Sequence, residues 1–132
     1  MTTVYLAGAM FGLTLEDMNG WRMSVARELL SCGFAVLNPV DTDFGPEPTG
    51  REITDSNEFQ IRHSDVVLAE FNRETVSIGT VGEVVFAWMI NKPVITWGGA
   101  VYVEHPWIRE RTTRHFASLG DAVDYIVRNY SK

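Results

Sequence analysis

The sequence predicts an α/β fold of the flavodoxin-like, doubly wound class, with a five-stranded parallel sheet in strand order 2-1-3-4-5 and helices on both faces. Short apolar runs alternate with amphipathic stretches, which is typical of parallel strands connected through helices. The central runs are apolar throughout, as expected for strands covered on both faces. The chain has 132 residues, and we expect a single domain over residues 1–132.

The first half of the chain is expected to contribute three strands and two helices. Apolar residues from Met18 to Leu29 recur at helical spacing, and Gly33 follows them as a stop signal. Three prolines between residues 39 and 51 predict an irregular loop. In chain order, we expect a strand at 4–7, a helix at 15–32, a strand at 34–37, a helix at 52–63 and a strand at 65–71.

The second half continues the alternation, and one of its helices is unusual. We expect a helix at 80–91, a strand at 93–97, a short helix at 106–112, a strand at 115–118 and a helix at 120–129. Residues 84–90 are apolar around the whole helix, whereas a surface helix of a monomer should have a polar face. We therefore expect its outer side to pack against another subunit, with cover by neighbouring helices as the alternative.

Composition excludes several functional classes. The net charge of −6, from 17 acidic against 11 basic residues, argues against polymeric nucleic acid or an anionic membrane as the partner. The single cysteine excludes an internal disulfide and a thiolate-cluster metal site. The longest apolar run is too short to span a bilayer, and no secretory segment opens the sequence. We expect a cytoplasmic protein without a metal or cofactor.

The segment from Ser77 to Glu83 is the most informative one. In a parallel sheet, ligands bind beyond the carboxyl ends of the strands, where we expect the loops 8–12, 39–51 and 72–82 to meet. Glycines in this segment allow close approach of the backbone, and the amides of a first helical turn favour anions. Glu83 has two interpretations: it forms a capping box with Thr80, or it is a carboxylate available as a nucleophile.

Other candidates lie in the loops and in the first strand. Residues 8–12 match neither a dinucleotide-binding nor a P-loop motif. An exposed Met10-Phe11 pair fits stacking against a flat base, and a plain turn is the alternative. Tyr5 is a core residue or a hydroxyl directed at a carboxylate. Asp43 is solvated or reads the edge of a base. The three histidines show no metal-ligand spacing.

Four segments together resemble the nucleoside 2-deoxyribosyltransferase family, over about residues 4–128. They are Tyr5-Leu6-Ala7-Gly8, residues 64–69, Ser77-x-Gly79-Thr80-x-x-Glu83 and Asn91-Lys92-Pro93-Val94. The resemblance implies cleavage of N-glycosidic bonds in deoxynucleosides or their 5′-monophosphates. It implies that Glu83 is the nucleophile, that Tyr5 orients it, and that the loop with Gly8, Met10 and Phe11 contacts the substrate.

Ser77 indicates one branch of that family. Six residues before the nucleophile, transferases acting on free nucleosides carry Asp, whereas the 5′-monophosphate N-hydrolases carry Ser. An Asp would repel a phosphate, whereas a Ser hydroxyl can donate to it. The resemblance therefore implies that Ser77 and the amides of Gly79 and Thr80 bind a 5′-phosphate. It also implies a homodimer or higher homo-oligomer in which a neighbouring subunit completes the site, with His105 as a contact.

Asn57 departs from the family pattern, because the family usually has Asp eight residues before Asp65. Asn cannot protonate a leaving base. Three alternatives follow. Asn57 only hydrogen-bonds the sugar; the leaving base is protonated by another residue or by water; or the protein binds nucleotides without efficient catalysis. The leading hypothesis is an N-glycosidase of (deoxy)nucleoside 5′-monophosphates. A nucleoside 2-deoxyribosyltransferase and a non-catalytic nucleotide-binding module are the alternatives.

Overall fold

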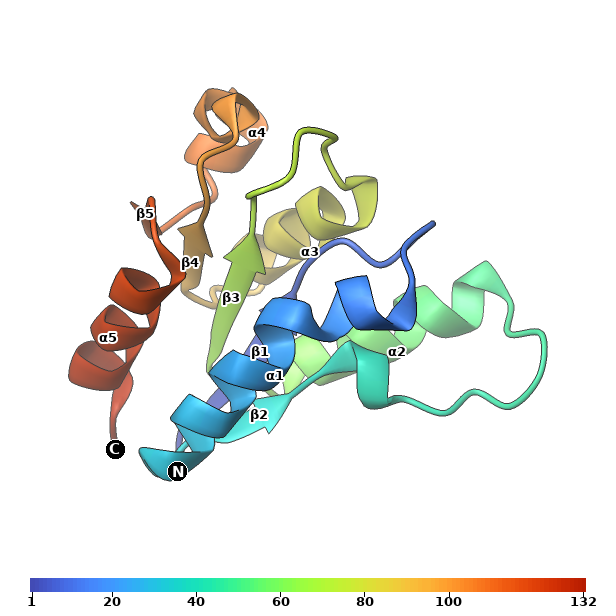
Figure 1. Ribbon diagram of the computed structural model, residues 1–132, viewed down its shortest axis with the longest axis horizontal. Helices are drawn as coiled ribbons and strands as arrows, with labels where there is room; N and C mark the ends of the chain where they lie inside the picture. Colours follow the sequence, from blue (N-terminus) through green and yellow to red (C-terminus); the bar gives the residue numbers. More distant parts are fainter.

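The computed structural model describes residues 1–132 and confirms the predicted sheet (Figure 1). All five strands are parallel, in the order β2-β1-β3-β4-β5. The strands are β1 (Thr3–Ala7), β2 (Ala35–Leu37), β3 (Val66–Glu70), β4 (Val94–Trp97) and β5 (Arg114–Phe116). The α-helices are α1 (Leu15–Ser31), α2 (Gly50–Arg62), α3 (Ile78–Met89), α4 (Pro106–Arg109) and α5 (Leu119–Tyr130). None of these helices has the length and apolar character needed to cross a membrane.

Several predicted boundaries are wrong, and two of them have a clear capping reason. α2 begins inside the expected loop because Thr49 and Glu52 form a capping box. α3 begins two residues early because Ser77, rather than Thr80, caps it. The expected loop also holds the 3-10 turn η1 (Pro39–Asp41), and a second turn, η2 (Val101–Glu104), precedes α4. α4 and β5 are shorter than expected.

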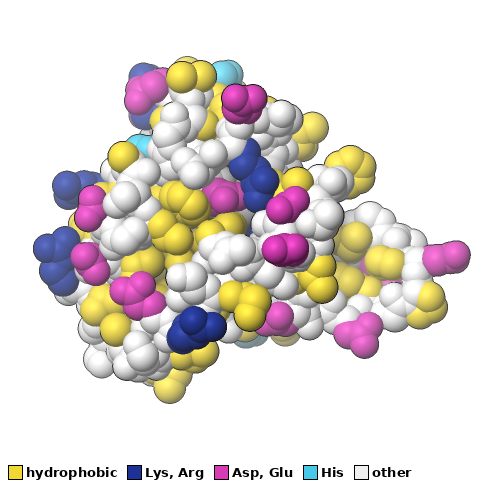
Figure 2. All heavy atoms as spheres, viewed as in Figure 1, with side chains coloured by type: hydrophobic (Ala, Val, Ile, Leu, Met, Phe, Trp, Pro, Cys, Tyr) yellow, Lys and Arg dark blue, Asp and Glu magenta, His cyan; other side chains and the backbone are white.

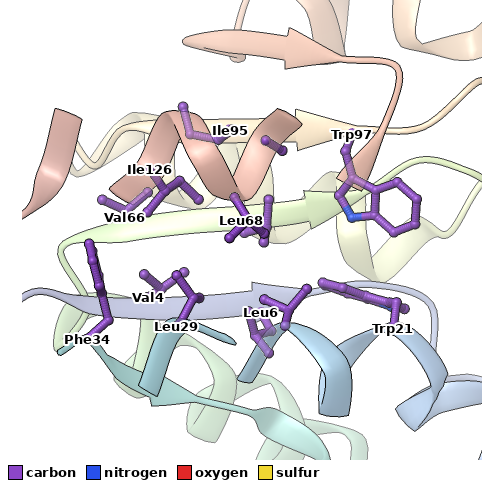
Figure 3. Packing of buried hydrophobic residues seen from close by; sticks show 13 residues of the cluster. Val4, Leu6, Trp21, Leu29, Phe34, Val66, Leu68, Ile95, Trp97 and Ile126 are labelled. Atoms are coloured by element: carbon purple, nitrogen blue, oxygen red, sulfur yellow. The ribbon is translucent and has the colours of Figure 1, made fainter. Parts of the chain in front are cut away.

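The strands alternate their side chains between two apolar clusters. One face packs against α1 and α5, and Figure 3 shows its cluster, in which Val4 and Leu6 lie beside side chains of both helices. Trp21 and Trp97 close this cluster near the carboxyl ends of the strands, with ring centroids 5.7 Å apart. The other face packs against α2, α3 and α4. Tyr5 belongs to this second cluster, so its side chain extends toward α3.

The carboxyl ends of β3 and β4 meet at a position that only glycine fits. Gly98 has φ +129°, and a Cβ there would lie 2.2 Å from the carbonyl oxygen of Phe71. The same carbonyl accepts a hydrogen bond from the amide of Ala100. This close contact fixes the start of the segment 71–77, which leads into α3.

Candidate active site

Tyr5 and Glu83 meet at the carboxyl edge of the sheet. Tyr5 is fully buried in β1, and its hydroxyl donates a hydrogen bond to Oε2 of Glu83 in the second turn of α3. The capping interpretation of Glu83 is wrong, because the Thr80 amide donates to Ser77 Oγ. Glu83 is partly buried, so its carboxylate is held in a defined orientation and keeps some access from outside.

The surroundings of Glu83 shift the pKa of its carboxyl group. Burial raises the pKa of Glu83 to about 7, while the hydrogen bond from Tyr5 and the positive charge of Arg22 oppose that rise. Burial and the nearby Glu83 carboxylate raise the pKa of Tyr5 far above its usual value. Tyr5 therefore remains a donor at neutral pH, and Glu83 changes its charge close to neutrality. Such a poised carboxylate is typical of functional sites.

Ser77 at the N-cap of α3 keeps a free hydroxyl proton. Its Oγ accepts from the Thr80 amide at 3.2 Å and from the Thr80 hydroxyl at 2.8 Å. A hydroxyl has two acceptor positions and one proton, so both acceptor positions are filled and the proton remains available to a ligand. The cap uses the Thr80 amide, which we expected to contact a phosphate. The amides of Ile78 and Gly79 have no partner within the helix.

The loop after β1 combines a buried start with an exposed tip. Gly8 is buried, and its carbonyl accepts from Arg22 at 3.0 Å. A Cβ at Gly8 would lie 2.9 Å from the Trp21 ring, so glycine is needed here for packing against α1. Met10 is partly buried, and Phe11 is fully exposed. An exposed Phe at this edge is available to stack on a flat ring.

The remaining predicted residues lie farther out. Asn57 is partly buried on α2, which packs beside α3. Asp43 is exposed, and its carboxylate accepts the amide of Gly45 at 2.8 Å. Figure 1 shows that this loop between η1 and α2 projects away from the sheet, so the structure does not bring Asp43 to Glu83. His105 is exposed and caps α4, where its Nδ1 accepts the amide of Trp107 at 3.2 Å.

Three charged residues near the site escaped the sequence analysis. Arg22 is completely buried on α1. Glu70 ends β3 and is nearly buried, and its Oε1 pairs with Nε of Arg73 at 3.3 Å. Figure 2 shows acidic and basic side chains together at this end of the sheet, between α1 and α4. A signal for Arg22 existed: it lies four residues after Met18 and three before Val25, within the apolar stripe of the predicted helix.

The outer side of α3 is partly covered by its neighbours. Val84 and Ala87 are buried against the sheet, whereas Trp88 and Met89 are 48% and 66% exposed. The guanidinium of Arg111 lies 4.3 Å from the Trp88 ring centroid and 4.6 Å from that of Trp107. Cover from this arginine is incomplete, so an apolar surface remains on α3. That a second subunit covers it stays a prediction.

A family model described as nucleoside 2-deoxyribosyltransferase matches residues 4–104 of the chain. The match includes Tyr5, Ser77 and Glu83, which the structure brings to the same edge of the sheet. It extends to the end of η2 and leaves α4, β5 and α5 outside it. No curated protein sequence matches the chain.

Solved structures of similar proteins share the whole fold at low sequence identity. A 2-deoxyribosyltransferase from Bacillus psychrosaccharolyticus has a TM-score of 0.75 and 18% identity, over 94% of this chain and 92% of that one. The CMP N-glycosidase BcmB from Clostridium botulinum has a TM-score of 0.62 and 17% identity, over 96% and 97%. A molybdenum cofactor binding protein from Rippkaea orientalis has a TM-score of 0.66 and 14% identity, over 98% and 96%.

Proposed function

This chain belongs to the nucleoside 2-deoxyribosyltransferase family, and we propose that it is an N-glycosidase of (deoxy)nucleoside 5′-monophosphates. The products are the free base and the sugar 5-phosphate. The observation that carries the proposal is the Tyr5–Glu83 pair at the carboxyl edge of the sheet, six residues along the chain from the Ser77 hydroxyl. Together these groups offer an oriented nucleophile and a phosphate donor on one surface.

Glu83 acts as the nucleophile in this proposal. Its carboxylate oxygen attacks C1′ of the sugar while the C1′–N bond breaks, and the base leaves with the bonding electron pair. The base takes up one proton from solvent, because the Asn57 amide is not acidic enough to transfer one. A water molecule then attacks C1′, loses a proton, and releases the Glu83 carboxylate. Tyr5 holds the attacking carboxylate in place through both steps.

Ser77 and the start of α3 bind the 5′-phosphate in this proposal. The free Ser77 proton and the amides of Ile78 and Gly79 are donors at a helix N-terminus, where an anion is favoured. A serine rather than an aspartate at this position supports a phosphorylated substrate over a free nucleoside. The similar fold of a CMP N-glycosidase supports the same substrate class. Phe11 stacks on the base, and Gly8, Met10 and Asn57 line the site.

A homodimer completes the site in this proposal. The exposed apolar surface of α3, with Trp88 and Met89, is the surface that a second copy covers. His105 of the neighbouring copy supplies a further contact to the phosphate. Its Nδ1 is used by the cap of α4, so Nε2 is the ring nitrogen that reaches the substrate. Asp43 contributes only if its loop moves toward the sheet when the base binds.

A nucleoside 2-deoxyribosyltransferase is the second candidate, and the family itself favours it. In that reaction another base, in place of water, attacks C1′ of the glycosyl enzyme. A nucleotide-binding module without efficient catalysis is the third candidate, which the missing acid at Asn57 favours. The three differ in what they release: free base from a nucleotide alone, free base only with an acceptor base present, or no base.

Chromatography of a panel of nucleosides and 5′-monophosphates after incubation with the protein tests the proposal. We expect free base from monophosphates without an acceptor base, and at least a thousandfold slower release by Glu83→Gln. Glu28→Gln, on the exposed end of α1, is the matched control and should cleave like wild type. Mass spectrometry of the denatured protein should show the sugar phosphate bound to Glu83. Equal cleavage by Glu83→Gln would exclude Glu83 as the nucleophile.

A further inference from the structure

Arg22 is the largest completely buried side chain in the protein. Its Nη1 donates to the carbonyl of Met18 at 2.8 Å, and its Nη2 donates to the carbonyl of Gly8 at 3.0 Å. Its Nε is buried without any acceptor. Burying a charge costs several kcal/mol of folding free energy unless the charge is paired. Packing under the loop after β1 therefore does not by itself explain why an arginine is buried here.

No carboxylate forms an ion pair with Arg22. Glu70, the acidic residue that ends β3 on the same face of the sheet, pairs with Arg73 instead. Arg73 is held from its other side, because its Nη2 donates to the carbonyl of Asp17 at 3.1 Å. Arg22 therefore has no ion pair of its own, although the charges of Glu83 and Glu70 act on it.

Other donors around Arg22 add to this positive potential. The indole N–H groups of Trp21 and Trp97 are also buried without an acceptor, and the Trp21 ring centroid lies 5.2 Å from the Arg22 guanidinium carbon. The Trp21 indole thus adds a second unpaired donor beside the guanidinium. A positive potential of this kind favours the ionised form of a nearby carboxylate.

Glu83 is a carboxylate on which this charge acts. The chain from Tyr5 to Gly8 connects the two groups: Tyr5 donates to Glu83, and three residues later Gly8 accepts from Arg22. Arg22 is close enough to Glu83 to influence it electrostatically. Two more arginines belong to the neighbouring elements: Arg62 lies over the Phe86 ring and Arg111 over the Trp88 ring. Tyr5 and Arg22 are the ionisable groups that lower the pKa of Glu83.

We propose that Arg22 is a positioning residue of the active site, which holds the carbonyl of Gly8 in place and supplies a buried positive charge that favours the ionised form of Glu83. The hydrogen bond to Gly8 fixes the loop after β1. The positive charge acts on Glu83 by electrostatic attraction, without a direct contact. The inference rests on the proposed function only in taking Glu83 as the reacting group. A purely structural role would need the packing of the side chain but not its charge.

The test is the titration of Glu83, followed by ¹³C NMR in protein labelled at glutamate Cδ. The Glu83→Gln spectrum assigns the signal. The variants are Arg22→Met, which keeps most of the apolar stem, Arg22→Lys, which keeps the charge, and Arg27→Met on the exposed side of the same helix. We expect Arg22→Met to move the midpoint upward by about one pH unit, Arg22→Lys to move it by less than half as much, and Arg27→Met to leave it unchanged.

A midpoint in Arg22→Met equal to that of wild type overturns the inference. If Arg22→Met does not fold at pH 8, the double variant Arg22→Met/Glu83→Gln is the test. We expect the second change to restore part of the lost stability, because the carboxylate that favours the cation is gone, while the hydrogen bond to the Gly8 carbonyl stays lost. No gain in stability at all overturns the inference. The titration needs no activity, so a shifted midpoint in a protein that cleaves nothing would refute the proposed function and leave the role of Arg22 intact.

Discussion

The hydroxyl of Tyr5 donates a hydrogen bond to Oε2 of Glu83, which joins the first strand to a helix 78 residues later in the chain. The ring of Tyr5 is packed in the core between the sheet and α3, so the donor cannot move away from the carboxylate. The partly buried carboxylate of Glu83 is thereby fixed in orientation before any substrate arrives. Preorganisation of this kind lowers the cost of reaching the transition state.

Tyr5→Phe removes the donor and leaves the ring in the core. The hydrogen bond from Tyr5 holds the pKa of Glu83 down, so we expect that pKa to rise above about 7 in the variant. Cleavage of a 5′-monophosphate at pH 7 should fall by roughly fivefold for a rise of one pKa unit, since the ionised fraction falls from about one half to about one tenth. The pH dependence of kcat/KM measures it, and an acidic limb at the wild-type position would contradict the expectation.

Glu83→Gln should stabilise the protein at pH 8 and have little effect at pH 4. The pKa of Glu83 is raised from 4.5 in an unfolded chain to about 7 in the folded one. Between these values the native state binds more protons, so stability from this group falls as pH rises. Removing the carboxyl group should add up to about 3 kcal/mol at pH 8. Urea unfolding at both pH values checks this, with Glu28→Gln as a control that should show no such pH dependence.

Gly98→Ala should destabilise the protein strongly. Its φ of +129° disfavours any side chain, and the added Cβ would lie 2.2 Å from the Phe71 carbonyl oxygen. We expect a loss of more than about 3 kcal/mol in the free energy of unfolding. Gly120→Ala is the control, since a Cβ there meets nothing within 4 Å at the start of α5. A Gly98→Ala protein as stable as Gly120→Ala would show that the ends of β3 and β4 can separate without cost.

Ser77→Asp separates capping from phosphate binding. Asp is as good an N-cap as Ser, so stability should change by less than about 0.5 kcal/mol. Its negative charge should weaken binding of a 5′-monophosphate by at least tenfold and leave a free nucleoside nearly unaffected. Ser77→Ala should instead lose about 1 kcal/mol of stability with the cap. Calorimetric titration with both ligands tests this, and an equal loss for nucleoside and monophosphate would refute the phosphate assignment.

Met89→Glu should break the proposed homodimer. Met89 is 66% exposed on α3, and burying a carboxylate in an apolar interface is costly. Leu30→Glu is the matched control, because Leu30 is 59% exposed but lies on α1, on the other side of the sheet. Sedimentation at micromolar concentration should give two chains for wild type and Leu30→Glu, and one for Met89→Glu. A wild-type protein that sediments as a single chain would refute the shared site.

Sequence patterns predicted the sheet because its central strands are largely apolar runs bounded by turn residues, and the strand order followed from the flavodoxin-like fold class that this alternation indicates. They could not decide between the two interpretations of Glu83, because spacing alone fits Thr80 as a cap as well as it fits Ser77. The deciding contact is the hydrogen bond from the Thr80 amide to Ser77 Oγ, and the hydrogen-bond partner of Glu83 is Tyr5, 78 residues away. Arg22 was missed for the same reason: its partner Gly8 lies on another element, although its place in an apolar stripe was a local signal.

Ser77 and Glu83 belong to one helix, and this fixes their separation. Six residues of α-helix span about 9 Å along the axis, and a packed helix does not stretch. If the proposed function is correct, α3 sets the distance between the groups that contact the anomeric carbon and the phosphate. Substrates with the anion at another distance are then disfavoured. Adding one residue to the helix would turn Glu83 by about 100° away from Tyr5. A change in accepted substrate length would thus require the anion to be bound by a residue other than Ser77, outside α3.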